Sequence, residues 1–204
     1  MIEKGVCSGQ GGQGMVLVGE LIAKAALKEG LEVSVYPSYG PEMRGGAANS
    51  KYVISDELIA NPVVADLDVA IIMNNVSMDK FVCSYDQMLE RENLKKQGKR
   101  VLDGTLRKNG VLIYNSSLIP FEDVPKRDGL SIYAVPASEL VDADNKIPNM
   151  ILLGAYMQAK RRPRLETLEE IFKESFTGGK AKFIDSNLRD IRIGMWYVSE
   201  EYIY

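Results

Sequence analysis

The sequence predicts an α/β protein with a mostly parallel sheet, helices on both of its faces and a helical C-terminal extension. Strand-like runs alternate with stretches of helical period along most of the chain. A glycine-rich turn, "GQGGQG" at 9–14, joins the first of these strands to the first helix. The continuous apolar run "DVAIIMN" at 68–74 is typical of a strand that is buried on both faces.

Each element of the first half follows from a local pattern. A short apolar run at 6–8 ends the first strand, and apolar residues then recur at helical spacing over Met15–Lys28. Gly30 stands where the C-terminal cap of that helix is expected. Alternation over 31–37 predicts a second strand that stops at a proline, and "KYVISD" at 51–56 predicts a third.

The second half continues the alternation and then becomes helical. A helix is expected over 78–97, and strands are expected at 110–117 and 130–137 on either side of a turn-rich segment. Three further helices, at 147–160, 165–175 and 180–198, form the extension, which begins near Asp144. The sequence has no internal repeat, low-complexity tract or linker, so residues 1–204 are expected to form a single domain.

Composition excludes several classes of function. Apolar residues make up 46% of the chain and charged ones 26%, which is enough to bury a full core. The net charge of −3 gives no reason to expect a nucleic-acid partner. No apolar run is long enough for a membrane span of roughly 18 residues, and the N-terminus lacks the pattern of a secretory signal. We therefore expect a cytoplasmic protein without membrane or nucleic-acid contacts.

Cysteine and histidine content limits the chemistry that this chain can do alone. The chain has no histidine, and its two cysteines, Cys7 and Cys83, are far apart in the sequence. Two thiols cannot hold an iron–sulfur cluster or a structural zinc, and the lack of histidine removes the Ser-His-Asp and Cys-His mechanisms. We expect no metal site and no catalytic residue, and both cysteines are expected to be reduced, half-buried apolar residues.

The glycine turn gives the chain a Rossmann-like start, since Gly9, Gly11 and Gly14 fit G-x-G-x-x-G between a strand and a helix. A nicotinamide cofactor also needs an acid at the end of the second strand, where this sequence reads "YPS", and Glu32 lies at the wrong end. Two interpretations remain. The loop can offer backbone N–H groups to an anion or a partner, or its glycines can simply permit close packing of helix and sheet.

A second glycine cluster, "SYGPEMRGG" at 38–46, connects two predicted strands. Pro41 stiffens the backbone, and the paired glycines at its far end permit positive φ. The loop therefore displays one aromatic ring, one carboxylate and one guanidinium, at Tyr39, Glu42 and Arg44. An arginine fork suits a carboxylate or a phosphate, and the alternative is an internal Glu42–Arg44 salt bridge or a helix cap.

Together these motifs resemble a known family. "GQGGQG", "SYGPEMRGGAANS" leading into "KYVISD", and "IPNMILLGAY" resemble the gamma subunit of the 2-oxoacid:ferredoxin oxidoreductases, and Lys180, Asn187 and Gly194 fit the same pattern. The resemblance spans nearly the whole of 1–204, which it identifies as one gamma-type domain. It implies a part in the oxidative decarboxylation of a 2-oxoacid with coenzyme A, which gives acyl-CoA, carbon dioxide and reduced ferredoxin.

The resemblance also implies that other chains carry the cofactors. Thiamine diphosphate, magnesium and iron–sulfur clusters are expected on alpha, beta and delta partner subunits, and ferredoxin is reached through the complex. The residues agree, because the cysteine sets for clusters are missing and no GDG precedes Asn74–Asn75 at the spacing of a thiamine site. Coenzyme A enters as a co-substrate, and this chain alone is expected to bind no cofactor.

The resemblance places the candidate site on the two glycine motifs, near coenzyme A or the thiamine centre. The candidate residues are Gly9, Gly11, Gly12, Gln13, Gly14, Tyr39, Gly40, Glu42, Arg44, Gly45, Gly46 and Asn49. The second motif resembles 2-oxoglutarate and branched-chain enzymes more than the indolepyruvate type, and it does not separate 2-oxoglutarate, 2-oxoisovalerate and pyruvate. The other functional hypotheses are a stand-alone NAD or FAD dehydrogenase and a non-catalytic structural adaptor.

Two further expectations concern surfaces. The stretch "ERENLKKQGKRVLDGTLRKNG" at 90–110 is either a solvated excursion or a region that docks a partner or the coenzyme A phosphates. Its basic residues are Arg91, Lys95, Lys96, Lys99, Arg100, Arg107 and Lys108. "KRRPR" at 160–164 is expected to be a helix end that favours positive charge. An exposed glycine-loop face predicts self-association of the isolated chain, for example as a homodimer.

Overall fold

A computed structural model of the chain describes residues 1–39, 47–62, 64, 66–82, 89–90, 93, 96–97, 105–141 and 147–200. Several predictions fall on residues outside these ranges. They concern Cys83, most of the second glycine motif, at Gly40, Glu42, Arg44, Gly45 and Gly46, and much of the charged stretch, at Arg91, Lys95, Lys99 and Arg100.

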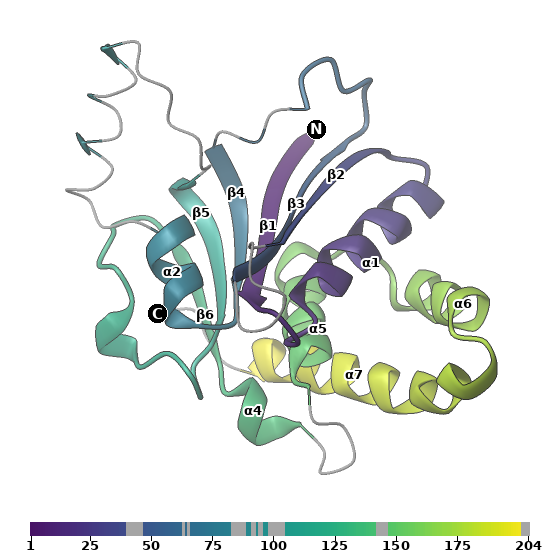
Figure 1. The fold of residues 1–204 in the computed structure, drawn as a ribbon. Coiled ribbons are helices and arrows are strands. Elements are labelled where there is room, and N and C mark those ends of the chain that lie inside the picture. The colour runs from purple at the N-terminus through teal and green to yellow at the C-terminus, as the bar shows by residue number, and fades with distance from the viewer. Residues whose placement is uncertain are drawn as a thin grey trace.

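The described residues form one six-stranded sheet in the order β2-β3-β1-β4-β5-β6 (Figure 1). Strands β1, β4, β5 and β6 pair in parallel, and β3 pairs antiparallel with both β1 and β2, so β3 alone is reversed. The strands are β1 Ile2–Gln10, β2 Glu32–Tyr39, β3 Ala47–Ser55, β4 Asp66–Ile72, β5 Thr105–Asn115 and β6 Ser131–Val135. The predicted mostly parallel sheet is therefore confirmed.

Helices cover both faces of this sheet, as expected (Figure 1). Helices α1, α5 and α6 contribute to the core on one face, with α7 packed against α5, and α2 covers the other face. The helices are α1 Met15–Lys28, α2 Asn75–Phe81, α4 Ala137–Leu140, α5 Asn149–Lys160, α6 Leu165–Ser175 and α7 Ile184–Glu200, with short 3-10 turns at Phe121–Asp123 and Gly178–Phe183.

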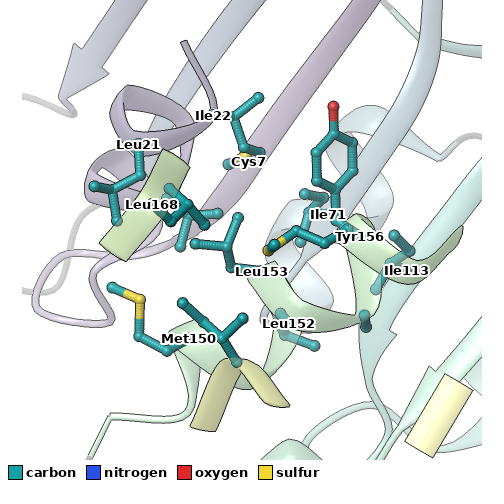
Figure 2. Packing of buried hydrophobic residues seen from close by; sticks show 14 of the residues in the cluster. Cys7, Leu21, Ile22, Ile71, Ile113, Met150, Leu152, Leu153, Tyr156 and Leu168 are labelled. Carbon is teal, nitrogen blue, oxygen red and sulfur yellow. The ribbon is translucent and has the colours of Figure 1, made fainter. Parts of the chain in front are cut away.

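Alternating side chains of the central strands feed two separate hydrophobic clusters. In β4, Val69 and Ile71 join the cluster under α1 and α5, and Ala70 and Ile72 join the cluster under α2. Figure 2 shows the first cluster, which gathers side chains of the sheet, α1, α5 and α6. The prediction that the 68–74 run is buried on both faces is confirmed, and this burial makes the sheet a rigid base for the loops at its ends.

The helical extension is confirmed as helices, and α5 is also a central part of the core. Met150, Leu152 and Leu153 of α5 are buried in the cluster shown in Figure 2. Helix α7 crosses α5 at two glycines, Gly154 and Gly194. A Cβ at either glycine would overlap a backbone carbonyl oxygen of the other helix, so the two helices approach almost backbone to backbone.

A buried carboxylate ties the first strand to this helical layer. Glu3, in β1, accepts hydrogen bonds from the hydroxyls of Tyr156 at 2.7 Å and Tyr52 at 3.3 Å. Its second oxygen lies 3.1 Å from the Lys160 ammonium, in the last turn of α5. Strands β1 and β3 are thus joined to α5 through a single side chain. The basic helix end expected at 160–164 is confirmed, with Arg161 as the C-cap of α5.

One expectation about the fold is corrected. One continuous helix over 78–97 is wrong, because α2 begins earlier, at a capping Asn74, and ends at Phe81 with non-helical backbone at Val82. In the first βαβ segment, β2 does not pair with β1, since the reversed β3 lies between them. In the described part of the chain, no helix is both long and apolar enough to span a membrane.

Candidate functional site

The candidate site lies where the connections of the parallel strands diverge. The chain leaves the carboxyl end of β1 into α1, on one face of the sheet, and the carboxyl end of the neighbouring β4 into α2, on the other (Figure 1). In open α/β sheets, ligands bind at such a switch point because the diverging connections leave a crevice between the strand ends. The glycine loop is the connection from β1 to α1 at this switch point.

The loop turns tightly between β1 and α1. The Gln13 N–H donates to the Gln10 carbonyl at 3.0 Å, and the Gln10 N–H donates to the Gln13 side-chain oxygen at 2.7 Å. Gly12 has φ +95 and no atom within 4 Å of where a Cβ would be, so the tip of the loop faces open space. A side chain at Gly12 would be strained by its backbone conformation and not by crowding.

The last glycine of the motif caps α1. Gly14 has φ +70, and no side chain caps the helix there, so the first turn of α1 has backbone N–H groups without a side-chain acceptor. The Gly14 carbonyl accepts from the Val18 N–H at 3.2 Å and from the Asn149 side-chain amide at 3.1 Å. Asn149, at the start of α5, is only 5% exposed.

A pocket of about 670 Å³ opens beside the glycine loop. The described residues that line it are Gln10, Gly11, Gly12, Gly14, Met15, Val16, Tyr39 and Ala48. Tyr39 ends β2 and is 69% exposed, so the first glycine motif and the start of the second line one pocket. None of these lining side chains is charged, so the positive potential that favours an anion here comes from backbone N–H groups and the dipole of α1.

The structure does not bring Asn49 to this pocket. Gly9, Tyr39 and Ala48 are direct neighbours across β1, β2 and β3, and they share the face on which α1 lies. Asn49 is one residue further along β3, opposite Ser8, and successive residues of a strand point to opposite faces. The Ser8 hydroxyl donates to Ser77 of α2 at 2.9 Å, so Asn49 belongs to the α2 side of the sheet.

Two asparagines that the sequence did not single out as site residues contact the loop. One is Asn149. The other is Asn74, whose amide nitrogen donates to the Gln13 side-chain oxygen at 3.3 Å and whose oxygen accepts from the Ser77 N–H at 3.0 Å. The only local signals were the "NN" after an apolar strand and the "PN" before a helix. Neither pattern predicts a contact with a loop so distant in sequence.

The remaining candidates sit apart from the pocket or outside the described residues. Gly40, Glu42, Arg44, Gly45 and Gly46 belong to the undescribed segment. In the charged stretch, Arg107 of β5 forms an ion pair with Asp68 of β4 at 2.7 Å, so this arginine links two neighbouring strands. Lys108 is exposed on β5.

No metal or thiol chemistry is evident in the part of the chain that the structure describes. No group of three or more His, Cys, Asp or Glu side chains there could hold a metal ion. Cys7 is fully buried, more deeply than the half-buried position expected, and burial raises the pKa of its thiol well above the usual range, with a smaller contribution from the charge of Glu3. A thiol held protonated in this way is a weak nucleophile.

Comparison with known sequences places the chain among oxidoreductases. The family model described as pyruvate ferredoxin/flavodoxin oxidoreductase matches residues 5–197. Ketoisovalerate oxidoreductase subunit VorA of Methanothermobacter marburgensis is 33% identical over 192 residues, which cover 92% of this chain and 34% of VorA. 2-Oxoglutarate synthase subunit KorC of Methanocaldococcus jannaschii is 29% identical over 176 residues, which cover 84% of this chain and 82% of KorC. The chain thus spans about a third of the VorA relatives.

Comparison with solved structures supports the fold. Pyruvate oxidoreductase subunit PORC of Thermotoga maritima aligns with a TM-score of 0.70 at 24% identity, over 95% of this chain and 94% of that one. A 2-oxoglutarate:ferredoxin oxidoreductase of Magnetococcus marinus, solved with 2-oxoglutarate, coenzyme A and succinyl-CoA bound, aligns with a TM-score of 0.71 at 21% identity, over all of this chain and 32% of that one.

Proposed function

Because the chain belongs to the pyruvate ferredoxin/flavodoxin oxidoreductase family, we propose that it is the gamma component of a multi-subunit 2-oxoacid:ferredoxin oxidoreductase. The observation that carries this proposal is the family match over 5–197, nearly the whole chain. The match to most of KorC supports a separate subunit of this size, and the match to a third of VorA supports partners that supply the rest. The enzyme would then be active only as a complex.

The proposed reaction cleaves the bond between the carboxylate and the 2-oxo carbon of the substrate. Carbon dioxide leaves, the remaining acyl group forms a thioester with the coenzyme A sulfur, the thiol proton is released, and the electron pair reduces ferredoxin. Thiamine diphosphate supplies the carbanion chemistry in this proposal. The described residues do not fit that group or an iron–sulfur cluster, because they offer neither a metal-binding set nor a cysteine set. We propose that those groups are held by alpha, beta and delta partners.

The role we propose for this chain is to hold coenzyme A and close the site. Gly11, Gly12 and Gly14 line a pocket at the uncapped start of α1, where backbone N–H groups and the helix dipole favour phosphate oxygens. Tyr39 offers an exposed ring at the other side of the pocket. Gly9 and Gln13 complete this loop. In this proposal, Arg44 of the motif at 40–46 supplies the positive charge. Cytoplasmic location remains part of the proposal.

Arg44→Ala, made in the reconstituted complex, tests this role. Charge-assisted hydrogen bonds contribute roughly 1.5–3 kcal/mol, so the variant should raise the KM for coenzyme A about tenfold to a hundredfold while the complex stays assembled. Arg44→Lys should recover only part of the loss, since lysine lacks the bidentate fork. Arg107→Ala is the matched control, because Arg107 pairs with Asp68 away from the pocket.

The same variants separate the competing roles. If Arg44 serves the subunit interface, the complex dissociates and the KM values for all substrates change together. If neither assembly nor the KM for coenzyme A changes, the proposed role of this loop is wrong, and a structural adaptor is the better description. Assays of the complex with pyruvate, 2-oxoglutarate and 2-oxoisovalerate would identify the 2-oxoacid.

A further inference from the structure

We infer that Asn149 and Asn74 are positioning residues that clamp the base of the glycine loop from two sides, so that its exposed tip keeps one shape for its ligand. Each side-chain amide comes from a different element, and the two contact consecutive loop residues, Gln13 and Gly14. The identity of the ligand, coenzyme A, rests on the proposed function.

The first bridge holds Gly14. Its carbonyl accepts from the Asn149 amide at 3.1 Å, and a Cβ on Gly14 would run into that same amide. The glycine and the asparagine therefore fit one another, since the φ of +70 and the space taken by Asn149 both exclude a side chain at position 14. Asn149 is itself fixed, because α5 is packed against α7 at Gly154.

The second bridge holds Gln13. Its side-chain oxygen accepts from the Gln10 N–H at 2.7 Å, which closes the turn, and from the Asn74 amide at 3.3 Å. The oxygen of Asn74 accepts from the Ser77 N–H at the start of α2. Asn74 thus uses both ends of its amide, one on the loop and one on the helix that covers the opposite face of the sheet.

Between these bridges and the pocket, the tip of the loop has no such support. Gly11 and Gly12 are exposed, and Gly12 has open space around it. Because its base is held in place, the loop loses less conformational freedom on ligand binding than a loop without these bridges would. Loss of a bridge should therefore weaken ligand binding, and it should leave the chemistry on the partner subunits unchanged.

Hydrogen exchange of the loop amides in the full chain tests the clamp directly. Asn149→Asp keeps the size and the acceptor of the side chain and removes the donor to Gly14. Asn74→Asp removes the donor to Gln13 and keeps the cap on Ser77. Each variant should speed exchange of the Gln10 and Gln13 amides, whose hydrogen bonds close the turn, about tenfold, the effect of losing one hydrogen bond. The inference is overturned if exchange at these residues stays at the wild-type rate.

Thr167→Val is the matched control, because it removes a similarly buried hydrogen bond, to Glu29 at 2.8 Å, far from the loop. It should leave exchange of the Gln10 and Gln13 amides unchanged. Equal acceleration in this control would also overturn the inference, because the effect would then report a general loss of stability.

Kinetics of the reconstituted complex separate this inference from the proposed function. Asn149→Asp should raise the KM for coenzyme A about tenfold and leave the turnover number and the KM for the 2-oxoacid unchanged. Gly12→Ala, which strains the tip itself, is the reference. If Gly12→Ala raises the KM for coenzyme A and Asn149→Asp does not, the clamp is refuted and the proposed function stands. If neither variant raises it, the placement of coenzyme A fails, and hydrogen exchange alone decides for or against the clamp.

Discussion

Replacement of Glu3 by glutamine should destabilise the chain through a single buried contact. In the wild type, one carboxylate oxygen accepts from Tyr156 at 2.7 Å, and the other lies 3.1 Å from the Lys160 ammonium. Glutamine can still accept from Tyr156 with its amide oxygen. Its nitrogen then faces Lys160, so two donors oppose each other where an ion pair stood.

The size of the effect follows from burial. Breaking a fully buried ion pair costs about 3–5 kcal/mol, because an unpaired charge remains out of water. The Lys160 side chain is 24% exposed and can turn toward solvent, so the loss of unfolding free energy should not exceed about 3 kcal/mol, the lower end of that range. We expect a loss of about 2 kcal/mol. For a domain of this size, that loss lowers Tm by roughly 4–8 °C.

Thermal unfolding followed by circular dichroism measures this loss, and a double-mutant cycle assigns it. Lys160→Met removes the opposing donor, so Glu3→Gln combined with Lys160→Met should cost less than the two single losses added together. Asp56→Asn, at the exposed contact between Asp56 and the N-terminal ammonium, is the control and should leave Tm unchanged. A Glu3→Gln variant as stable as the wild type would refute the assignment of this carboxylate as a structural hub.

Three other predictions test separate features. Gly154→Ala should cost at least about 1–3 kcal/mol in unfolding free energy, because its Cβ meets the Ile191 carbonyl, while Gly179→Ala, which has open space around it, should cost almost nothing by the same denaturant titration. Burial raises the pKa of the Cys7 thiol, so the folded state keeps a proton that the unfolded state loses above pH about 8.5. The unfolding free energy should therefore fall by up to about 1.4 kcal/mol per pH unit above that pH. Cys7→Ala should flatten this decline, and an unchanged slope in the variant would contradict the raised pKa. Light scattering of the isolated chain should show concentration-dependent self-association, and a clean monomer at high concentration would argue against an exposed interface.

The helices and strands could be predicted well because each pattern is local. The period of apolar residues fixed α1 as Met15–Lys28 and α6 as Leu165–Ser175, and the structure has the same bounds. The single helix over 78–97 was wrong because Asn74 caps α2 early and the backbone leaves the helical region at Val82. Polar periodicity continues past that point, so it could not reveal the break.

Strand order and sheet face depend on pairing that the sequence does not state. The position of the reversed β3 between β1 and β2 depends on which strands pair along their edges. The alternation within "KYVISD" is the same whichever way the strand runs relative to its neighbours. The placement of Asn49 depends on a register of one residue, since its neighbour Ala48 lines the pocket. The glycine motif could identify the loop, but it could not identify Asn149, which meets Gly14 across 135 residues of chain.

The link between Glu3 and Tyr156 has a consequence for how the chain acquires its shape during synthesis. The two residues are 153 positions apart, and the cluster between α1 and the sheet is completed only by α5 and α6. At about 5–20 residues per second, the ribosome needs roughly 8–30 s to make the intervening chain. Through that interval, the apolar face of β1 and β3 can be covered only in part, by α1, in the nascent polypeptide. Chaperone demand should therefore peak before the last quarter of the protein emerges, and truncation within α5 should yield aggregates in place of a smaller folded unit.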